Sequence, residues 1–140
     1  MDFTEVLKAR HMVRRYLPDP VDTETLTRVV KVVHRAPSAG FSQGHRLVVV
    51  TDNELRGRIA DLFEEPYATS GFPDWVRQAP VLIALCVREE SYHERYRQPD
   101  KLDDDGNEIE WPVPYWWFDS GSLLTLLQLA AANEGLATGF

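Results

Sequence analysis

Two arginines near the N-terminus have the chemistry and the spacing to bind a phosphate. The 140-residue chain carries a net charge of −7, but residues 6–18 contain no Asp or Glu. Guanidinium groups form paired hydrogen bonds that match phosphate oxygens, and Arg10 and Arg14 share one side of this stretch whether it is helical or extended. The stretch therefore predicts a site for a small anion, although its charge alone also fits a solvated helix end. Its basic side chains and histidine are Lys8, Arg10, His11, Arg14 and Arg15.

A second candidate is the loop over residues 35–44, which reads Arg-Ala-Pro-Ser-Ala-Gly-Phe-Ser-Gln-Gly. Its small residues let the backbone approach a flat ligand closely. Ser38 and Gln43 can form directional hydrogen bonds with the edge of a heteroaromatic ring. Taken alone, the same loop also fits a plain connection between a helix and a strand.

The other polar residues predict no metal site. Cys86 lies in the apolar run 79–87, which predicts a buried and unreactive thiol, and a single cysteine excludes an internal disulfide. The acidic residues 103–110 do not match a calcium-binding loop, so we expect a solvated acidic loop there. The four histidines lack the spacing of zinc ligands.

The hydrophobic pattern predicts both helices and strands. Asp22 or Thr23 can cap a helix that should end before Pro37. A long irregular connection is expected over residues 98–117, and loops of that length are often functional. The other expected helices cover residues 2–10, 53–64 and 119–134, and the expected strands cover residues 47–50 and 81–87.

The helix expected over residues 119–134 is apolar around most of its circumference. Such a helix must be covered on nearly every side, either as the central helix of a layered domain or against another subunit. Residues 136–140 should begin a strand that has almost no length in which to pair. Two strands and this short segment cannot cover the helices, so we expect downstream residues or a partner chain to complete the domain.

Aromatic residues gather just before this helix. Their ordinary role is burial in a core or an interface, and the alternative is a wall over a substrate pocket. These residues are Trp111, Tyr115, Trp116, Trp117 and Phe118.

The bulk composition predicts one soluble, cytoplasmic domain. Hydrophobic residues make up 44% and charged residues 26% of the chain, which is typical of globular proteins. The chain has no apolar run near the ~18 residues of a membrane span and no signal-peptide pattern at its start. Its net negative charge argues against binding to nucleic acids or to anionic membranes.

The two candidate segments, taken in this order, resemble the nitroreductase family of FMN enzymes. Residues 10–16 (Arg-His-Met-Val-Arg-Arg-Tyr) are similar to the family's N-terminal phosphate-binding motif. Residues 36–43 (Ala-Pro-Ser-Ala-Gly-Phe-Ser-Gln) are similar to its flavin-ring loop. Residues 111–121 and the helix after them resemble the loop and central helix of actinobacterial-type members.

This resemblance implies an α+β fold, a nitroreductase-like mixed-sheet sandwich flanked by helices, in which residues 1–140 form a single domain whose C-terminal part is lacking. It also implies an intimate homodimer with FMN at the subunit interface. FMN would take hydride from NAD(P)H and pass it to a nitro compound, a quinone or a similar small acceptor, without a catalytic side chain from the protein. By position, the implied phosphate and ribityl contacts are Arg10, His11, Met12 and Arg14, and the implied ring contacts are Pro37, Ser38, Ala39, Gly40 and Gln43.

The chain also departs from the family pattern. Met12 replaces a hydroxyl residue, Phe41 stands where many members have a polar residue, and Gly44-His45 replaces Pro-Trp. Because family members continue well beyond the match to residue 136, we expect the 140-residue chain to hold at best half a flavin site. Two alternatives keep the fold: a non-catalytic flavin-binding or interaction module that needs a partner chain, and an enzyme similar to the flavin destructases that make dimethylbenzimidazole.

Overall fold

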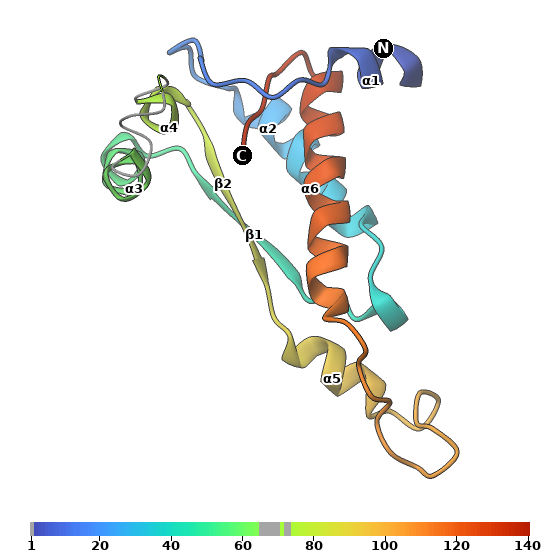
Figure 1. Cartoon of the computed structure of the whole chain (residues 1–140). Coiled ribbons are helices and arrows are strands. Elements are labelled where there is room, and N and C mark those ends of the chain that lie inside the picture. Colours follow the sequence, from blue (N-terminus) through green and yellow to red (C-terminus); the bar gives the residue numbers. More distant parts are fainter. Residues whose placement is uncertain (1, 65–70, 72–73) are drawn as a thin grey trace.

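The computed structural model describes residues 2–64, 71 and 74–140, and one long helix runs through the middle of it (Figure 1). This helix is α6 (Tyr115–Asn133). The other helices are α1 (Phe3–Ala9), α2 (Thr23–Val30), the short 3-10 helices η1 (Lys31–Arg35) and η2 (Ala39–Phe41), α3 (Asn53–Glu64), α4 (Trp75–Gln78) and α5 (Glu90–Tyr96). The strands are β1 (His45–Val50) and β2 (Leu82–Val87).

The first two helices begin where their capping residues predict. In α1 the Asp2 carboxylate accepts the backbone N–H of Glu5 at 2.9 Å, and the Glu5 carboxylate accepts the N–H of Asp2 at 2.8 Å. These two reciprocal bonds form a capping box. Asp22, rather than Thr23, caps α2 by accepting the N–H of Thr25 at 2.8 Å. The helical stretch then ends with η1 at Arg35, before Pro37, as expected.

The core of the molecule forms where α6 meets α2, η1 and the sheet. β1 and β2 pair antiparallel, in a register that places Leu47 opposite Leu85. Both of these leucines pack against the buried cluster on α6, in which Leu123 is fully buried. The buried members of this cluster are Val29, Ala36, Leu123, Leu127 and Ala131. Among the described residues, no helix is both long and apolar enough to span a bilayer.

The prediction that Cys86 is buried is wrong, because its side chain is exposed. Successive side chains of a strand point to opposite faces of the sheet. Leu85 points to the α6 core, so its neighbour Cys86 lies on the other face of β2. The apolar run predicted burial on both faces, whereas in this chain the core covers one of them.

The expectation that residues 136–140 remain unpaired is also wrong. Thr138 forms a parallel bridge with Met12, and the N–H of Val13 donates to the Thr138 carbonyl at 2.9 Å. Gly139 makes this approach possible, because a Cβ atom there would overlap the backbone of Val13 and lie 2.7 Å from the Tyr16 hydroxyl oxygen. Among the described residues the sheet itself contains β1 and β2, which are antiparallel, and the parallel bridge lies outside it.

The hydrophobic pattern does not predict α4 or α5. α5 consists largely of charged and aromatic residues, and Tyr92 is its one buried residue, so it lacks the apolar stripe that marks a helix. α6 begins at Tyr115 rather than at residue 119, because the aromatic residues after Pro114 form its first turn. The irregular connection is therefore shorter than expected and covers residues 97–114.

This connection folds back onto α5 through Glu108. The Glu108 carboxylate lies 2.5 Å from Nδ1 of His93 and accepts hydrogen bonds from Nε1 of Trp111 at 2.7 Å and Nε of Arg97 at 2.9 Å. The other acidic residues of this loop are exposed, as expected, but the Glu108 side chain is only 18% exposed. Its three partners satisfy the charge that burial would otherwise make costly.

The contact shifts the pKa values of His93 and Glu108 in opposite directions. The hydrogen bond to Glu108 raises the pKa of His93 above its ordinary value, against the opposing effect of burial. Burial acts to raise the pKa of Glu108, but the hydrogen bonds from Trp111, His93 and Arg97 outweigh it and hold that pKa below its ordinary value. A raised histidine pKa stabilises the fold fully below the ordinary value, and this contribution is lost as the pH rises through the raised value. The Glu108 contribution is lost only when the pH falls through its lowered value.

We predict that the substitution His93→Gln lowers the melting temperature in a pH-dependent way. The difference from wild type should be largest near pH ~5.5, where His93 is charged and Glu108 is ionised, and should shrink as the pH rises above the raised pKa. Thermal unfolding between about pH 5 and about pH 9 measures it. His34→Gln is the control, since His34 is exposed and has no carboxylate partner among the described residues. A difference that does not change with pH would contradict the ion pair.

Candidate functional site

The two candidate segments contact α6 on opposite sides. The Asp119 carboxylate accepts the backbone N–H of Ala39 at 2.9 Å, and the Gln128 amide lies 3.9 Å from the Met12 sulfur. Gln128 follows Asp119 by nine positions, which correspond to about 14 Å along the helix axis and to about two and a half turns, so the two side chains point to opposite sides of the helix. Within one chain, α6 therefore stands between residues 10–14 and the loop over residues 37–43.

Residues 10–14 are extended rather than helical. α1 ends at Ala9, and Arg10 follows it with φ −68° and ψ 113°. The Arg10 side chain is half-buried and has no hydrogen bond or ion pair with any other described residue. His11 and Met12 are exposed. Of the two backbone alternatives for this segment, the helical one is therefore excluded.

Arg14 is held in place by groups from both ends of the chain. Its Nη2 donates to the carbonyl oxygen of Phe140 at 2.6 Å, and its Nη1 donates to the carbonyl of Val13 at 3.2 Å. The guanidinium carbon lies 4.4 Å from the ring centroid of Trp75, which is within the range of a cation–π contact. These contacts fix the guanidinium at the pairing of residues 12–14 with residues 138–140, and neither partner follows from the sequence motif.

The loop over residues 37–43, which we call the ring loop, has an unusual backbone. Gly40, Phe41 and Gln43 have φ values of 58°, 59° and 49°. Non-glycine residues in this left-handed region cost of order 1–3 kcal/mol each, so the surrounding structure must hold them there. Within the loop, the Ser38 hydroxyl oxygen accepts the N–H of Gln43 at 2.9 Å, and the Ser42 hydroxyl donates to the Ala39 carbonyl at 2.5 Å.

α5 holds the ring loop from outside. Nε of Arg95 donates to the Gly40 carbonyl at 2.9 Å, and the same guanidinium forms a two-point ion pair with Asp100 at 2.7 and 2.8 Å. Gly40 also packs closely on Tyr96, where a Cβ atom would lie 2.7 Å from the tyrosine ring. The sequence reasoning missed Arg95 and Tyr96, because α5 has no motif. Its tyrosines four residues apart, Tyr92 and Tyr96, were the available signal of one packed face.

A buried polar cluster lies directly behind the ring loop. Tyr92 is fully buried, and His45 is 5% exposed. The Tyr92 hydroxyl lies 3.3 Å from Nε2 of His45. Burial first, and then the Asp119 carboxylate, raise the pKa of Tyr92, while burial lowers the pKa of His45. Gly44 makes room for the tyrosine, since a Cβ there would lie 2.9 Å from its ring.

The outer side of the ring loop offers groups to a ligand. Pro37, Phe41 and Gln43 are exposed, and the Gln43 amide has no hydrogen bond with any other described residue. Gln43 also borders a groove of about 510 Å³ between η1 and β1, whose walls are partly apolar and partly basic. Its polar lining residues are Lys31, His34, Gln43, His45 and Arg46.

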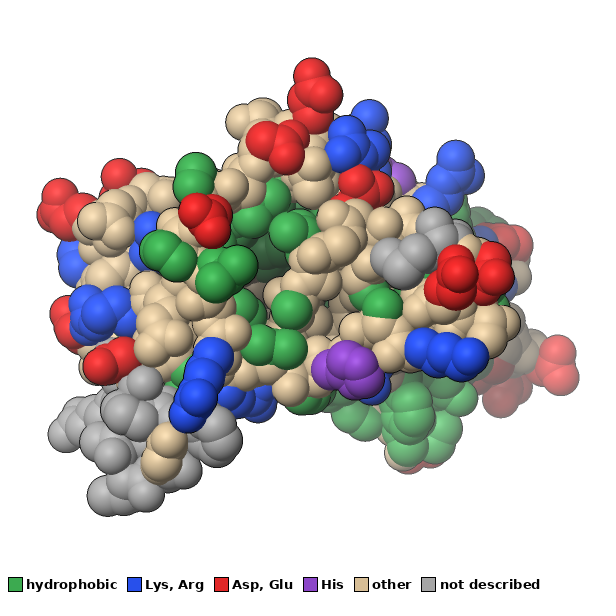
Figure 2. All heavy atoms as spheres, turned by 90° about the horizontal axis from the view of Figure 1, so that it is seen from above, with side chains coloured by type: hydrophobic (Ala, Val, Ile, Leu, Met, Phe, Trp, Pro, Cys, Tyr) green, Lys and Arg blue, Asp and Glu red, His purple; other side chains and the backbone are tan. Residues whose placement is uncertain are grey.

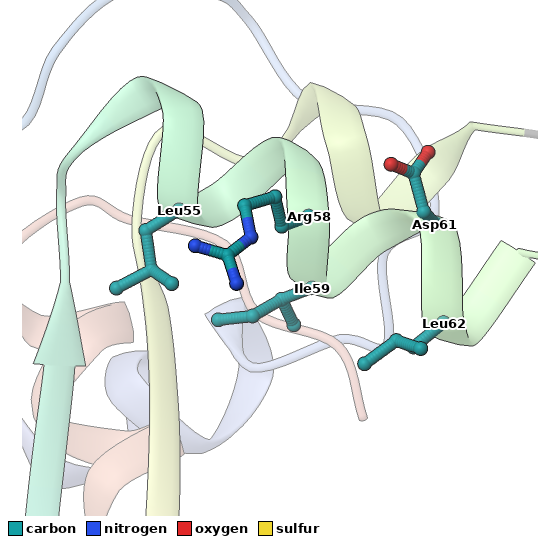
Figure 3. Close-up of a pocket in the computed structure, with 5 residues that line it drawn as sticks. All are labelled: Leu55, Arg58, Ile59, Asp61 and Leu62. Atoms are coloured by element: carbon teal, nitrogen blue, oxygen red, sulfur yellow. The ribbon is translucent and has the colours of Figure 1, made fainter.

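One further pocket contains none of the predicted site residues. A pocket of about 380 Å³ lies on α3, where Leu55, Ile59 and Leu62 point to one side and Asp61 points away (Figure 3). Within the described parts of the chain, no three His, Cys, Asp or Glu side chains are placed to bind a metal ion.

The aromatic residues around the start of α6 divide into two groups. Trp116 is buried and packs against Tyr92 and Trp111, at ring-centroid distances of 6.0 and 5.9 Å. Trp117 and Phe118 are 63% and 64% exposed. Burial in a core, which is the ordinary role of aromatic residues, is thus confirmed for Trp116. The exposed rings remain free to contact another molecule.

The tight packing of the ring loop predicts unequal effects of two glycine substitutions. Gly40 and Gly106 both have a positive φ, so alanine costs about 1 kcal/mol of backbone strain at either position. A Cβ at Gly106 would meet nothing within 4 Å, whereas at Gly40 it would overlap Tyr96. Gly40→Ala should therefore lower the free energy of unfolding by at least about 2 kcal/mol, and Gly106→Ala by about 1 kcal/mol. Denaturant unfolding measures both, and equal losses would show that Gly40 is not closely packed.

Comparison with known proteins matches this fold and these segments. The model of the nitroreductase family matches residues 7–140. FMN reductase (NAD(P)H) of Bacillus subtilis (strain 168) is 31% identical over 86 residues, which cover 59% of this chain and 32% of that protein. The 5,6-dimethylbenzimidazole synthase of Rhodobacter capsulatus is 35% identical over 85 residues, which cover 61% of this chain and 41% of that protein. The chain thus spans about a third to two fifths of the length of these relatives.

The three-dimensional structure gives the same result. The crystal structure of a nitroreductase family protein from Clostridium novyi NT superposes with a TM-score of 0.73 at 20% identity, covering 96% of this chain and 66% of that one. The expected α+β nitroreductase-like fold is therefore confirmed. Because the family model covers nearly all of its length, the chain belongs to the nitroreductase family.

Proposed function

We propose that this protein is an FMN-dependent oxidoreductase that passes hydride from NAD(P)H to a nitro compound, a quinone or a similar small acceptor. The observation that carries the proposal is the ring loop. Its left-handed backbone is held by contacts from α5 and α6, and it leaves the Gln43 amide exposed. A preformed loop with a free amide suits the polar edge of a flat heteroaromatic ring.

The residues present fit FMN. A phosphate monoester requires cationic donors, and Arg10 and Arg14 lie in a segment without any carboxylate. Arg10 has no other partner among the described residues, and Arg14 retains unused N–H groups beyond its bonds to Phe140 and Val13. Bound FMN would supply the hydride chemistry. The role of the protein is to bind and orient the flavin and its substrates.

We further propose that each flavin is shared by two copies of the chain. Because α6 separates residues 10–14 from the ring loop, one copy cannot bring both to the same flavin. A symmetric dimer places the phosphate segment of one copy beside the ring loop of the other, and repeats this at a second site. Seen from above, hydrophobic side chains gather around a hollow near the middle of the end that carries α1 and residues 10–14 (Figure 2). Exposed Phe3, Leu7 and Met12 belong to these segments and would be covered in such a dimer.

The exposed rings at the start of α6 favour flat aromatic molecules as substrates. Trp117 and Phe118 lie on the first turns of the helix, close to Asp119 and hence to the ring loop. Stacking on aromatic side chains favours planar molecules, a description that fits the nicotinamide ring, quinones and nitroaromatics.

A second candidate function follows from the similarity to 5,6-dimethylbenzimidazole synthase. The two functions differ in the fate of the flavin. An oxidoreductase returns FMN unchanged, whereas a flavin-destroying enzyme consumes it. Incubation with NAD(P)H and FMN in air, followed by mass analysis of the flavin, distinguishes them. Loss of FMN with appearance of a benzimidazole would favour the second function, and a protein that binds flavin without consuming NAD(P)H would be a non-catalytic module.

For the phosphate segment, we predict that Arg14→Ala weakens FMN binding about 10- to 100-fold, because it removes charge-assisted hydrogen bonds. Riboflavin lacks the phosphate, so its affinity should hardly change. Fluorescence titration of both flavins measures this. Arg15→Ala is the matched control, since Arg15 is the neighbouring arginine and is exposed. Equal losses for FMN and riboflavin would remove the phosphate role of Arg14.

A complementation experiment tests the shared site. Arg14→Ala damages one half of each site and Gln43→Ala the other, so homodimers of either variant have no intact site. In an equal mixture with random pairing, half of the dimers are mixed, and each mixed dimer has one intact site. We therefore expect about a quarter of the wild-type flavin sites to return on mixing. No recovery in a mixture shown to exchange subunits would contradict a flavin shared between copies.

A further inference from the structure

We propose that Asp119 is a positioning residue for the ring loop: its carboxylate holds the Ala39 backbone, and the buried pair Tyr92 and His45 lies behind the loop. The role of this cluster in flavin binding rests on the function proposed above. The cluster itself is a feature of the chain, and none of its three residues belongs to the segments that resemble the phosphate-binding motif or the ring loop.

The cluster joins three parts of the chain that are far apart in sequence, namely residues 39–45, α5 and α6. Asp119 lies in the second turn of α6, Tyr92 on α5, His45 at the start of β1 and Ala39 in the ring loop. Oδ2 of Asp119 is 2.9 Å from the Ala39 nitrogen, 80 residues away along the chain. Tyr92 and His45 are buried, while Asp119 is half-buried between them and the loop. Because these groups come from α5, α6, β1 and the ring loop, their relative positions are fixed by the packing of those elements.

The direction of the hydrogen bond to the loop follows from the groups present. A carboxylate only accepts, so the Ala39 N–H donates to Asp119. The Tyr92 hydroxyl and Nε2 of His45 lie 3.3 Å apart, and which of them donates depends on the tautomer of the imidazole. Burial, followed by the charge of Asp119, raises the pKa of Tyr92, and burial lowers the pKa of His45.

The ring loop needs such an anchor because of its backbone. Ala39 immediately precedes Gly40 and Phe41, which are both left-handed. Arg95 fixes the carbonyl of Gly40, and Asp119 fixes the N–H of Ala39, so one peptide group before the turn and one within it are held by different helices. Of these two hydrogen bonds, the one to Asp119 comes from α6, which is also the helix against which the core packs.

The test compares Asp119→Ala with Asp119→Asn. The alanine variant removes the acceptor, so we expect FMN and riboflavin to bind about 10-fold more weakly, by the same factor, because the loop contacts the ring and not the phosphate. Asparagine keeps one acceptor oxygen for Ala39 and should recover most of the affinity. Tyr92→Phe keeps the packing of the ring but removes the hydroxyl that contacts His45 behind the loop, and it should weaken both flavins by an intermediate factor. Asp104→Ala, at an exposed aspartate of the connection, is the matched control.

A second measurement does not depend on the flavin. Hydrogen exchange of the Ala39 amide in the ligand-free protein should accelerate in Asp119→Ala and remain slow in Asp119→Asn and Asp104→Ala. If the wild type binds no flavin while Ala39 exchange follows this pattern, the positioning role stands and the proposed flavin function falls. The positioning role is overturned if Asp119→Ala leaves Ala39 exchange unchanged, or if it weakens FMN but not riboflavin.

Discussion

Covering apolar surface stabilises a fold by roughly 25 cal/mol per Å², and α6 is apolar on almost every side. The other elements are placed by how they cover this helix: α2 and η1 supply Val29 and Ala36, and the sheet supplies Leu47 and Leu85. Two of the polar side chains that interrupt its surface lie where other segments meet it. Asp119 meets the ring loop, and Gln128 meets the segment at Met12. One helix therefore fixes the positions of both candidate segments and also keeps them apart.

The elements predicted well from the sequence are those with local signals. Asp22 caps a helix that begins where its side chain predicts, and the spacing of leucines and valines predicts α2, α3, both strands and most of α6. The elements that the sequence did not predict depend on tertiary contacts. α5 is stabilised by ion pairs and by one buried tyrosine, which leave no periodic apolar pattern. The parallel pairing of Met12 with Thr138 joins the two ends of the chain, and no local preference encodes it.

The candidate site was predictable in its segments but not in its supports. The motif residues Arg14 and Gly40 lie in exposed or half-buried loops, as binding residues should. What holds them is a set of single contacts: Phe140 for Arg14, Arg95 and Tyr96 for Gly40, and Asp119 for the neighbouring peptide. Each of these contacts joins residues more than 50 positions apart, a distance over which charge, spacing and hydropathy carry no information. The supporting residues of a site are thus harder to infer than the residues they support.

The left-handed ring loop also bears on how fast a cofactor can enter. Its backbone is fixed by the protein alone, so the conformational entropy of ordering it is lost during folding and not during association. A flavin would meet a rigid surface and would dock in a single bimolecular step, without a slower loop closure following the encounter. Substitutions in this loop that change the affinity would then act mainly on the dissociation rate. The lifetime of the complex would therefore depend on how firmly α5 and α6 hold the turn.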